Sequence, residues 1–345
     1  MMPAAVILRG NFLSNEQVKT SRRILIIKMS SLGDILHALP VVRCLKEGLR
    51  ATIDWVAQPE YVELVKCFPD VSRVIPFPRR DFWRHFGEFR ADLRESKYDY
   101  IIDLQGLIKS ATVALLARGR KRIGPSFSRE GSRLAYHAVV GPVRRDRHAV
   151  DELMDVVRYF ALEVPHVLEF PAAFPKTQRP EPSPRVAIIP CSRWKTKNWP
   201  LERFVEVARA LRARAKATLF LVGSPADSGT CADIAAGAGE GIVNLCGRTS
   251  LVELGSLLQE MDLAVSVDSG PMHMAAAVGV PVLAVFGATD PRRTGPYGSR
   301  HRVITADHLS CRPCRSENCA RRDLACLRDL PADRVIAAAL EMLGR

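Results

Sequence analysis

Asp34 is the first residue whose type and position could support catalysis. It lies in the stretch KMSSLGDILH, from Lys28 to His37, where small residues separate a short apolar run from a helical pattern. Small residues at such a turn let the main chain approach a ligand, with amide groups pointing at it. A carboxylate at the start of the helix either caps that helix or acts as a general base, and the motif alone favours the cap. The stretch contains no G-x-G-x-x-G, so it does not indicate a dinucleotide site.

Two further loops combine hydroxyl, basic and small residues in a way that suits a phosphate group. The first, SRWKTKNWP, runs from Ser192 to Pro200, and the proline is well placed for the first turn of a helix. The second, DSGPMH, runs from Asp268 to His273 and opens a helix directly after an apolar strand pattern. Each loop alone could be a polar cap, but two in the same half of the chain favour a phosphate-bearing ligand.

Four cysteines near the C-terminus form the pattern C-x2-C-x4-C-x6-C. They are Cys311, Cys314, Cys319 and Cys326. The first spacing suits zinc, but the later spacings do not repeat the paired C-x2-C of common zinc sites. We therefore predict reduced or loosely paired thiols and no metal, with a structural metal as the less favoured alternative. Several of the other five cysteines lie in apolar periodic runs, which suits buried, reduced thiols in a cytosolic protein.

The elements that would position these loops alternate between strand and helix. The sequence predicts strands at 23–28, 51–57, 73–77, 98–104, 185–190, 218–222, 262–267 and 281–286. Helical patterns lie between them, including 107–116 and 201–213. This alternation predicts parallel sheets with right-handed crossovers. Two such doubly wound units would place ligands in the cleft between them, outside the carboxyl ends of the strands.

The length of 345 residues suits two domains. Frequent prolines and the lack of a helical period predict a linker at 165–184. The flanking segments, 23–164 and 185–345, are then predicted to form two Rossmann-like domains that face each other across a cleft. Residues 1–22 lack the apolar centre of a signal peptide and predict a loose N-terminal extension. The final amphipathic helix, 332–343, is a candidate to pack back on the first domain.

The net charge of +13 is concentrated in one stretch, 118–147, which holds nine Lys and Arg residues against two acidic ones. This concentration favours an anion-binding surface over a merely solvated face. Nucleic-acid binding is a different class that the charge could explain, but there is no recognition motif and the aromatic content is only 7%. The longest uncharged run, 269–289, contains three glycines and two prolines, so we expect helix, turn and strand there instead of a membrane span.

Together these motifs resemble glycosyltransferase family 9, the ADP-heptose:lipopolysaccharide heptosyltransferases. The resemblance covers about residues 23–345. It rests on KMSSLGDILHALP, IDLQGLIKSA, SRWKTKNWP, VSVDSGPMHMAAAVGVP and FGATDP followed by TGPYG. The stretch SREGSRLAYH, residues 128–137, is most similar to the first-acting members of the family, the heptosyltransferase I type. The four-cysteine tail is more similar to later-acting members, which leaves the position in the pathway open.

The resemblance implies a GT-B fold, which is an α/β architecture of two Rossmann-like doubly wound domains. It also implies an inverting, metal-independent transfer of L-glycero-D-manno-heptose from ADP-heptose, without a cofactor. The implied acceptor is a Kdo hydroxyl of Kdo–lipid A. The enzyme would therefore be cytoplasmic and in peripheral contact with the inner face of the inner membrane. The sequence has no Asp-x-Asp, the usual metal–diphosphate handle, which agrees with a metal-free mechanism.

The resemblance also implies roles for individual residues. Asp34 matches the general base that would deprotonate the acceptor hydroxyl, and Lys197 would offset charge on the leaving ADP. The other implied donor-binding residues are Ser192, Arg193, Asp227, Thr249, Asp268, Ser269, Gly270 and His273. The implied acceptor-binding residues are Gly33, His37, Lys109 and Arg129. The basic stretch 118–147 would then meet Kdo carboxylates and lipid A phosphates.

Two alternatives keep the same fold. The enzyme could add a heptose later in the core, or it could use another nucleotide sugar, such as a UDP-sugar, as a transferase or epimerase. In the second case Asp227 and the loop near Thr249 would have to recognise uracil. A comparison of thermal shifts with ADP, UDP and GDP separates these nucleotides.

Overall fold

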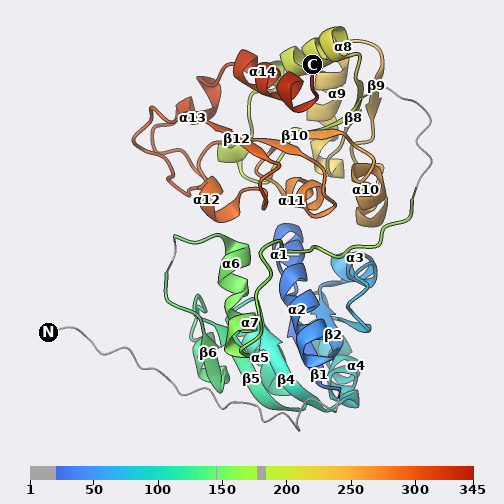
Figure 1. Cartoon of the computed structure of the whole chain (residues 1–345), viewed down its shortest axis with the longest axis vertical. Helices are drawn as coiled ribbons and strands as arrows, with labels where there is room; N and C mark the ends of the chain where they lie inside the picture. The colour runs from blue at the N-terminus through green and yellow to red at the C-terminus, as the bar shows by residue number, and fades with distance from the viewer. Residues whose placement is uncertain (1–20, 145, 177–183) are drawn as a thin grey trace, which may run out of the picture.

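The computed structural model describes residues 21–144, 146–176 and 184–345, which form two α/β domains stacked end to end (Figure 1). Each domain contains one six-stranded sheet in which every strand pair is parallel. The first sheet has the order β3-β2-β1-β4-β5-β6 and the second has the order β12-β11-β10-β7-β8-β9. Counted from its own first strand, each sheet therefore follows the Rossmann order 3-2-1-4-5-6.

The first domain contains six strands and the helices between them. The strands are β1 (Arg23–Ile27), β2 (Thr52–Ala57), β3 (Arg73–Pro76), β4 (Tyr98–Asp103), β5 (Gly119–Pro125) and β6 (Ala138–Val140). The α-helices are α1 (Leu32–His37), α2 (Leu39–Leu49), α3 (Val62–Lys66), α4 (Phe82–Glu95), α5 (Ile108–Leu116), α6 (Ala149–Leu153) and α7 (Asp155–Tyr159). Two 3-10 turns, η2 (Pro59–Tyr61) and η3 (Ser132–Ala135), complete the described part of this domain.

The second domain repeats the arrangement. Its strands are β7 (Arg185–Ile189), β8 (Thr218–Leu221), β9 (Ile242–Asn244), β10 (Leu263–Val267), β11 (Val282–Phe286) and β12 (Arg302–Thr305). Its α-helices are α8 (Leu201–Ala215), α9 (Ser228–Ala238), α10 (Leu251–Leu258), α11 (Gly270–Ala277), α12 (Pro291–Thr294), α13 (Ala325–Arg328) and α14 (Ala332–Met342). The 3-10 turns are η4 (Lys195–Lys197) and η5 (Pro225–Asp227).

The central strands are apolar at almost every position because both faces of each sheet are covered. In β1, Ile24 and Ile26 pack into one buried cluster, whereas Leu25 and Ile27 pack into another on the opposite face. Successive strand residues point to opposite faces, so a doubly covered strand cannot alternate with polar residues. The largest cluster contains residues of both domains, so apolar packing continues across their junction.

The predicted α/β architecture of two doubly wound domains is confirmed, but four strands were not foreseen. These are β5, β6, β9 and β12. β5 has the sequence GRKRIGP and is fully buried only over its last three residues, so it lacks the apolar run of a central strand. β6 and β9 have only three residues each. Strands this short at a sheet edge carry too little periodicity to be recognised.

The C-terminal helix does not pack on the first domain. α14 contacts α8 and the strands β10, β11 and β12, because its apolar face completes the core of the second domain. The extension 1–22 and part of the linker fall on residues 1–20 and 177–183, which lie outside the described residues. In the part of the chain that the structure describes, no helix is long and apolar enough to cross a membrane. The uncharged run 269–289 forms α11, a turn and β11, as predicted.

Candidate active site

The loops with the candidate side chains follow the two central strands of each sheet. Loops 28–31 and 104–107 follow β1 and β4, which are neighbours in the first sheet. Loops 190–197 and 268–269 follow β7 and β10, which are neighbours in the second. At such pairs the strand order reverses, so the two connections diverge and leave a crevice. The two domains meet with α1 in contact with α11 (Figure 1).

Two glycines allow α1 and α11 to approach closely. A Cβ on Gly33 would lie 2.5 Å from Cδ2 of His273. A Cβ on Gly270 would lie 2.9 Å from Cδ2 of Leu32. Real side chains do not tolerate such distances, so the contact between the domains requires glycine at both positions. Gly33, which was predicted on the acceptor side, therefore touches a residue that was predicted on the donor side.

Asp34 faces this junction and also caps its own helix. Its Oδ2 accepts hydrogen bonds from the Ser31 hydroxyl at 2.7 Å and from the Ser31 main-chain N–H at 3.1 Å. Its Oδ1 lies 3.8 Å from Nζ of Lys28, and 48% of the side chain is exposed. Partial burial raises the pKa of Asp34. The nearby Lys28 charge and the hydrogen bonds from Ser31 lower it by more, so the pKa lies below its ordinary value. The carboxylate is therefore ionised at neutral pH and accessible to a proton donor.

Lys28 is a site residue to which the sequence analysis gave no role. Its side chain is buried, and its Nζ donates to the carbonyl of Leu104 at 2.8 Å, so it joins the ends of β1 and β4. A lysine at the end of a strand buried on both faces is a recognisable signal, because a buried ammonium needs partners. Here the partners are that carbonyl and Asp34.

Three histidines meet at the domain junction. Nε2 of His37 lies 3.1 Å from Nδ1 of His273, and the ring of His148 stands 5.5 Å from that of His37. Burial lowers the pKa of His273 to about 4 and lowers the pKa of His37 well below its ordinary value. His148 accepts a hydrogen bond on Nδ1 from the Val150 N–H, so its Nε2 carries the proton that it donates to the Gly295 carbonyl. His37 and His273 are neutral at pH 7 and can hydrogen-bond a sugar without adding charge.

The two phosphate-type loops of the second domain lie side by side. Nζ of Lys197 is 2.9 Å from Oδ2 of Asp268, and the Thr289 hydroxyl donates to the same oxygen at 2.6 Å. Asp268 is buried, so this arrangement fixes the position of Lys197. Ser269 caps α11 by accepting from the Met272 N–H. The predicted convergence of Lys197 with Asp268 is therefore present in the structure, and Thr289 is a participant that the sequence analysis missed.

The loop that contains Ser192 and Arg193 is closed by a side chain. The amide group of Asn198 accepts from the Ser192 N–H at 2.7 Å and donates to the Ser192 carbonyl at 3.1 Å. Arg193 is exposed, and its charge opposes the rise that burial causes in the pKa of Tyr61, which belongs to the first domain. Arg193 therefore lies near the domain junction. Nζ of Lys197 also lies 4.7 Å from the centre of the Trp194 ring, close enough for a cation–π contact.

Asp227 and Thr249 lie at the carboxyl ends of β8 and β9, to one side of the central loops. Oδ2 of Asp227 accepts from both the N–H and the hydroxyl of Ser224, so the carboxylate caps a turn. Thr249 is half-buried and directly precedes Ser250, which caps α10. The proposed contacts of Asp227 with ribose and of Thr249 with adenine stay predictions.

Lys109 and Arg129 are both exposed on the first domain. They follow β4 and β5, and the Arg129 N–H donates to the Gly106 carbonyl at 2.8 Å, which holds the two loops together. The basic stretch 118–147 is not one loop, because it comprises β5, η3 and β6. Its role as an acceptor surface stays a prediction.

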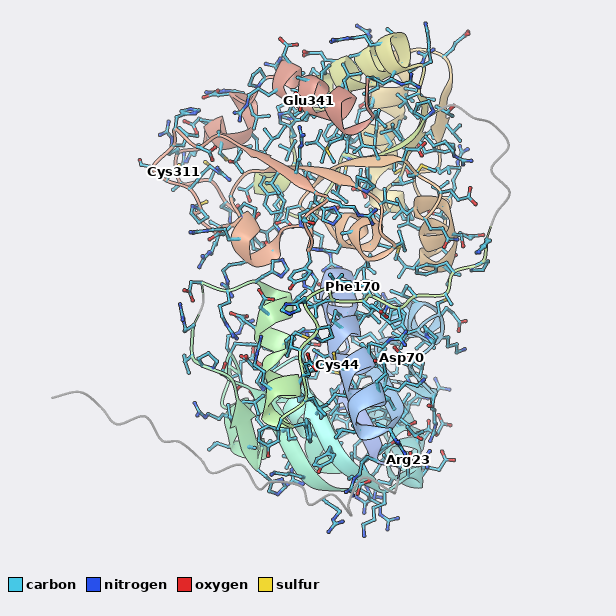
Figure 2. All side chains as sticks on the ribbon, viewed as in Figure 1. Arg23, Cys44, Asp70, Phe170, Cys311 and Glu341 are labelled. Carbon is cyan, nitrogen blue, oxygen red and sulfur yellow. The ribbon has the colours of Figure 1, made fainter. Side chains whose placement is uncertain are left out.

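A set of contacts beside the histidines joins the domains and was not foreseen. The Tyr297 hydroxyl donates to Asp151 at 2.9 Å, and Arg293 forms an ion pair with Glu152 at 3.4 Å. Together with the His148–Gly295 bond, these contacts connect the start of α6 to α12 and the segment that follows it. Figure 2 shows Phe170 at the same junction, and its ring centre lies 5.9 Å from that of Tyr297. The motif TGPYG was noted in the sequence, but nothing in it named these partners.

The four C-terminal cysteines line one cavity of about 20 Å³, together with Thr196 of loop 190–197. Figure 2 shows Cys311 at the outer edge of the second domain. The segment around these cysteines is held to loop 190–197 by the hydrogen bond from Thr196 Oγ1 to the Ser316 carbonyl (2.6 Å). Two more bonds hold it to the residues that follow β11: Arg315 N–H to the Ala288 carbonyl (2.8 Å) and Arg312 Nε to the Gly287 carbonyl (2.6 Å). All nine cysteines are free. No group of three or more His, Cys, Asp or Glu within the described ranges is arranged to hold a metal ion.

Comparisons with known proteins agree with this geometry. The sequence model of "Glycosyltransferase family 9 (heptosyltransferase)" matches residues 86–325. The chain is 31% identical to lipopolysaccharide heptosyltransferase 1 of Pseudomonas aeruginosa, over 86% of this chain and 87% of that protein. It is similar to the structure of E. coli heptosyltransferase WaaC with ADP, with a TM-score of 0.77, 26% identity, and coverage of 93% of this chain and 99% of that one. It is also similar to E. coli ADP-heptose lps heptosyltransferase II, with a TM-score of 0.75, 25% identity, and coverage of 93% and 98%.

Proposed function

Because the chain belongs to glycosyltransferase family 9 and is a heptosyltransferase of lipopolysaccharide core synthesis, we propose that it transfers L-glycero-D-manno-heptose from ADP-heptose to a Kdo hydroxyl of Kdo–lipid A, with inversion. The observation that carries this proposal is the position of Asp34. Gly33, the neighbour of Asp34, lies against His273, and Lys197 is 2.9 Å from Asp268, which directly precedes the helix that contains His273, so the loops of Asp34 and Lys197 meet beside one histidine. This arrangement suits in-line displacement between an acceptor on one domain and a donor on the other.

In the proposed reaction, the ionised Asp34 accepts the proton of the acceptor hydroxyl while its oxygen attacks the anomeric carbon of heptose. The bond between that carbon and the β-phosphate oxygen breaks, and ADP leaves with the bonding electrons. Lys197 offsets the charge that develops on the leaving diphosphate, and the main-chain N–H groups at the start of α11 add to this effect. Attack from the face opposite the leaving group inverts the anomeric configuration.

On the acceptor side, the exposed cations Lys109 and Arg129 fit the carboxylates of Kdo and the phosphates of lipid A. A lipid-anchored acceptor places the enzyme at the inner face of the inner membrane. The similarity of the cysteine tail to later-acting enzymes supports a second candidate, transfer to a core that already contains heptose.

The deciding experiment is mass-spectrometric detection of heptose transfer from ADP-heptose, with Kdo–lipid A and heptosyl-Kdo–lipid A as alternative acceptors. We expect transfer to Kdo–lipid A; transfer only to the heptosylated acceptor would assign a later step.

Asp34→Ala should remove most turnover while ADP affinity, measured by calorimetry, stays within a few-fold of wild type. Unchanged turnover would reject Asp34 as the base. A larger thermal shift with UDP or GDP than with ADP would reject the donor.

A further inference from the structure

We propose that the outer rim of the first domain docks on an anionic lipid bilayer, with Trp83, Ile108 and Leu134 entering the headgroup region. This rim, called here the docking rim, comprises residues 79–84, 108–109 and 129–134. The inference deepens the proposed function, because it assigns the surface that would hold the enzyme beside a lipid-anchored acceptor.

The docking rim exposes large apolar side chains that a water-soluble surface does not need. Leu134 is 93% exposed, Trp83 is 85% exposed and Ile108 is 52% exposed. They lie in η3, at the start of α4 and at the start of α5, respectively. These elements follow β5, β3 and β4, so all three side chains belong to the carboxyl edge of one parallel sheet.

Ring contacts and a hydrogen bond connect the three parts of the docking rim. The ring of Trp83 lies 5.4 Å from that of Phe82, which lies 5.8 Å from that of Phe77. Nζ of Lys109, at the start of α5, lies 6.0 Å from the centre of the Phe77 ring. The Ile108 N–H donates to the Glu130 carboxylate at 3.2 Å, and this bond ties α5 to the loop before η3. These contacts link the three segments of the rim, in part through the buried Phe77 ring.

The charges of the docking rim are mostly positive. Its exposed cations are Arg79, Arg80, Arg84, Lys109, Arg129 and Arg133. The rim has only two acidic residues, Asp81 and Glu130, and Glu130 is engaged by the Ile108 N–H. Arg79 also has a partner outside the rim, Glu60, at 3.9 Å. Basic side chains placed around exposed apolar ones complement a surface of anionic headgroups.

The kind of exposure favours lipid over a protein partner. The apolar side chains stand apart among arginines, whereas protein interfaces have a contiguous apolar centre from which charge is depleted. Tryptophan concentrates at the membrane–water interface, where an apolar ring and a polar N–H are both accommodated. Arginine can reach headgroups with its guanidinium while its stem lies against apolar surface.

The docking rim also borders the catalytic loop. Oε1 of Gln105, three residues before Ile108, accepts from the Met29 N–H at 3.0 Å and from the Ser30 N–H at 3.3 Å. Asp34 lies in α1, the helix that follows the loop of Met29 and Ser30. A lipid acceptor could therefore keep its acyl chains in the bilayer beneath the rim while its sugar reaches the domain junction.

Sedimentation with vesicles tests the docking rim. We expect the whole chain to sediment with vesicles of phosphatidylethanolamine and phosphatidylglycerol, less so at high salt, and only weakly with phosphatidylcholine. The double variant Trp83→Ser/Leu134→Ser should lose most of the bound fraction. The matched control is Val243→Ser/Val303→Ser, which removes two exposed apolar side chains from the second domain and should bind as wild type does. Equal losses in both variants, or none in the first, would overturn the proposal.

Fluorescence provides a readout that misfolding cannot imitate. Trp55 and Trp199 are buried and Trp194 is half-buried, so Trp83 is the tryptophan that would meet lipid. Brominated phosphatidylglycerol vesicles should quench wild-type emission, and Trp83→Phe should remove that quenching while sedimentation persists. Quenching that remains in Trp83→Phe would overturn the assignment of this surface.

Activity separates the docking rim from the proposed reaction. Trp83→Ser/Leu134→Ser should retain transfer to a de-acylated, water-soluble Kdo acceptor and lose it several-fold on vesicle-embedded Kdo–lipid A. Equal activity on both acceptors would reject the docking rim. Absence of transfer by the wild-type protein to either acceptor would reject the proposed acceptor, while the vesicle result would still decide the docking rim.

Discussion

Replacement of Lys28 by methionine would remove a positive charge from beside Asp34 and keep most of the buried side-chain volume. The ammonium lies 3.8 Å from the carboxylate oxygen. At about that distance, two unit charges interact by ~1 kcal/mol in water and by ~4 kcal/mol at an effective dielectric constant of about 20. Because the Asp34 side chain is 48% exposed, the weaker figure is the better guide. This corresponds to a movement of the acid limb of kcat/KM by roughly one pH unit.

The direction follows from the role of the carboxylate. Partial burial raises the pKa of Asp34, and Lys28 is the first of the opposing influences that bring it below its ordinary value. A general base must be unprotonated, so kcat/KM falls as the pH drops through that pKa. Without Lys28 the fall should begin at higher pH, while the rate near pH 8 changes little.

The assay is a pH profile of kcat/KM for heptose transfer. Lys66→Met is a suitable control, because Lys66 is exposed and forms an ion pair with the exposed Glu63. Loss of the charged Lys28 bond to the Leu104 carbonyl should cost about 1.5–3 kcal/mol, so thermal stability must be measured alongside. Lys28→Arg, which retains the charge, should restore the acid limb. An acid limb that stays in place in Lys28→Met would refute the electrostatic coupling of the two residues.

Three further predictions concern the domain junction. Lys197→Ala should weaken ADP binding by about ten- to a hundredfold and slow turnover, because a charged hydrogen bond contributes ~1.5–3 kcal/mol; intact binding in calorimetry would place the lysine outside the site. Gly33→Ala would put a Cβ 2.5 Å from His273 and should lower the Tm by overpacking worth about 1–3 kcal/mol, whereas Gly87→Ala, in open space on α4, should not. The depressed pKa of His273, about 4, means that the unfolded chain binds more protons as the pH falls from 6.5 towards 4, so folding should lose up to about 3 kcal/mol over that window. If the urea unfolding midpoints of wild type and His273→Gln change in the same way with pH across this range, the prediction is wrong.

The parts of the fold that could be predicted are those in which local pattern and burial agree. The strands RILII and LAVSV are almost wholly buried, and their continuous apolar sequences predict this burial. β5 was missed because Arg120, Lys121 and Arg122 precede its buried end, so its sequence resembles a basic loop. The single helical pattern expected after residue 34 is two helices, because α1 ends at His37 and Pro40 lies at the start of α2.

The candidate site follows a similar division. Asp34, Lys197 and Asp268 could be foreseen because each follows a central strand, and the topology brings such loops together. The contacts of His148 and Tyr297 could not, because they join segments about 150 residues apart, and spacing along the chain gives no sign of such pairs. Nor could the sequence show that Arg193 acts on the pKa of Tyr61, a residue of the opposite domain.

The cysteine-bearing segment holds loop 190–197 through the hydroxyl of Thr196, and it holds the residues after β11 through the main-chain carbonyls of Gly287 and Ala288. Residues far from the proposed donor site thus contribute to the positions of the loops that would bind the donor. We therefore expect alkylation of Cys311 or Cys314, both exposed, to weaken ADP binding by loosening this segment. Donor affinities of different preparations should then agree only when these thiols are in the same state.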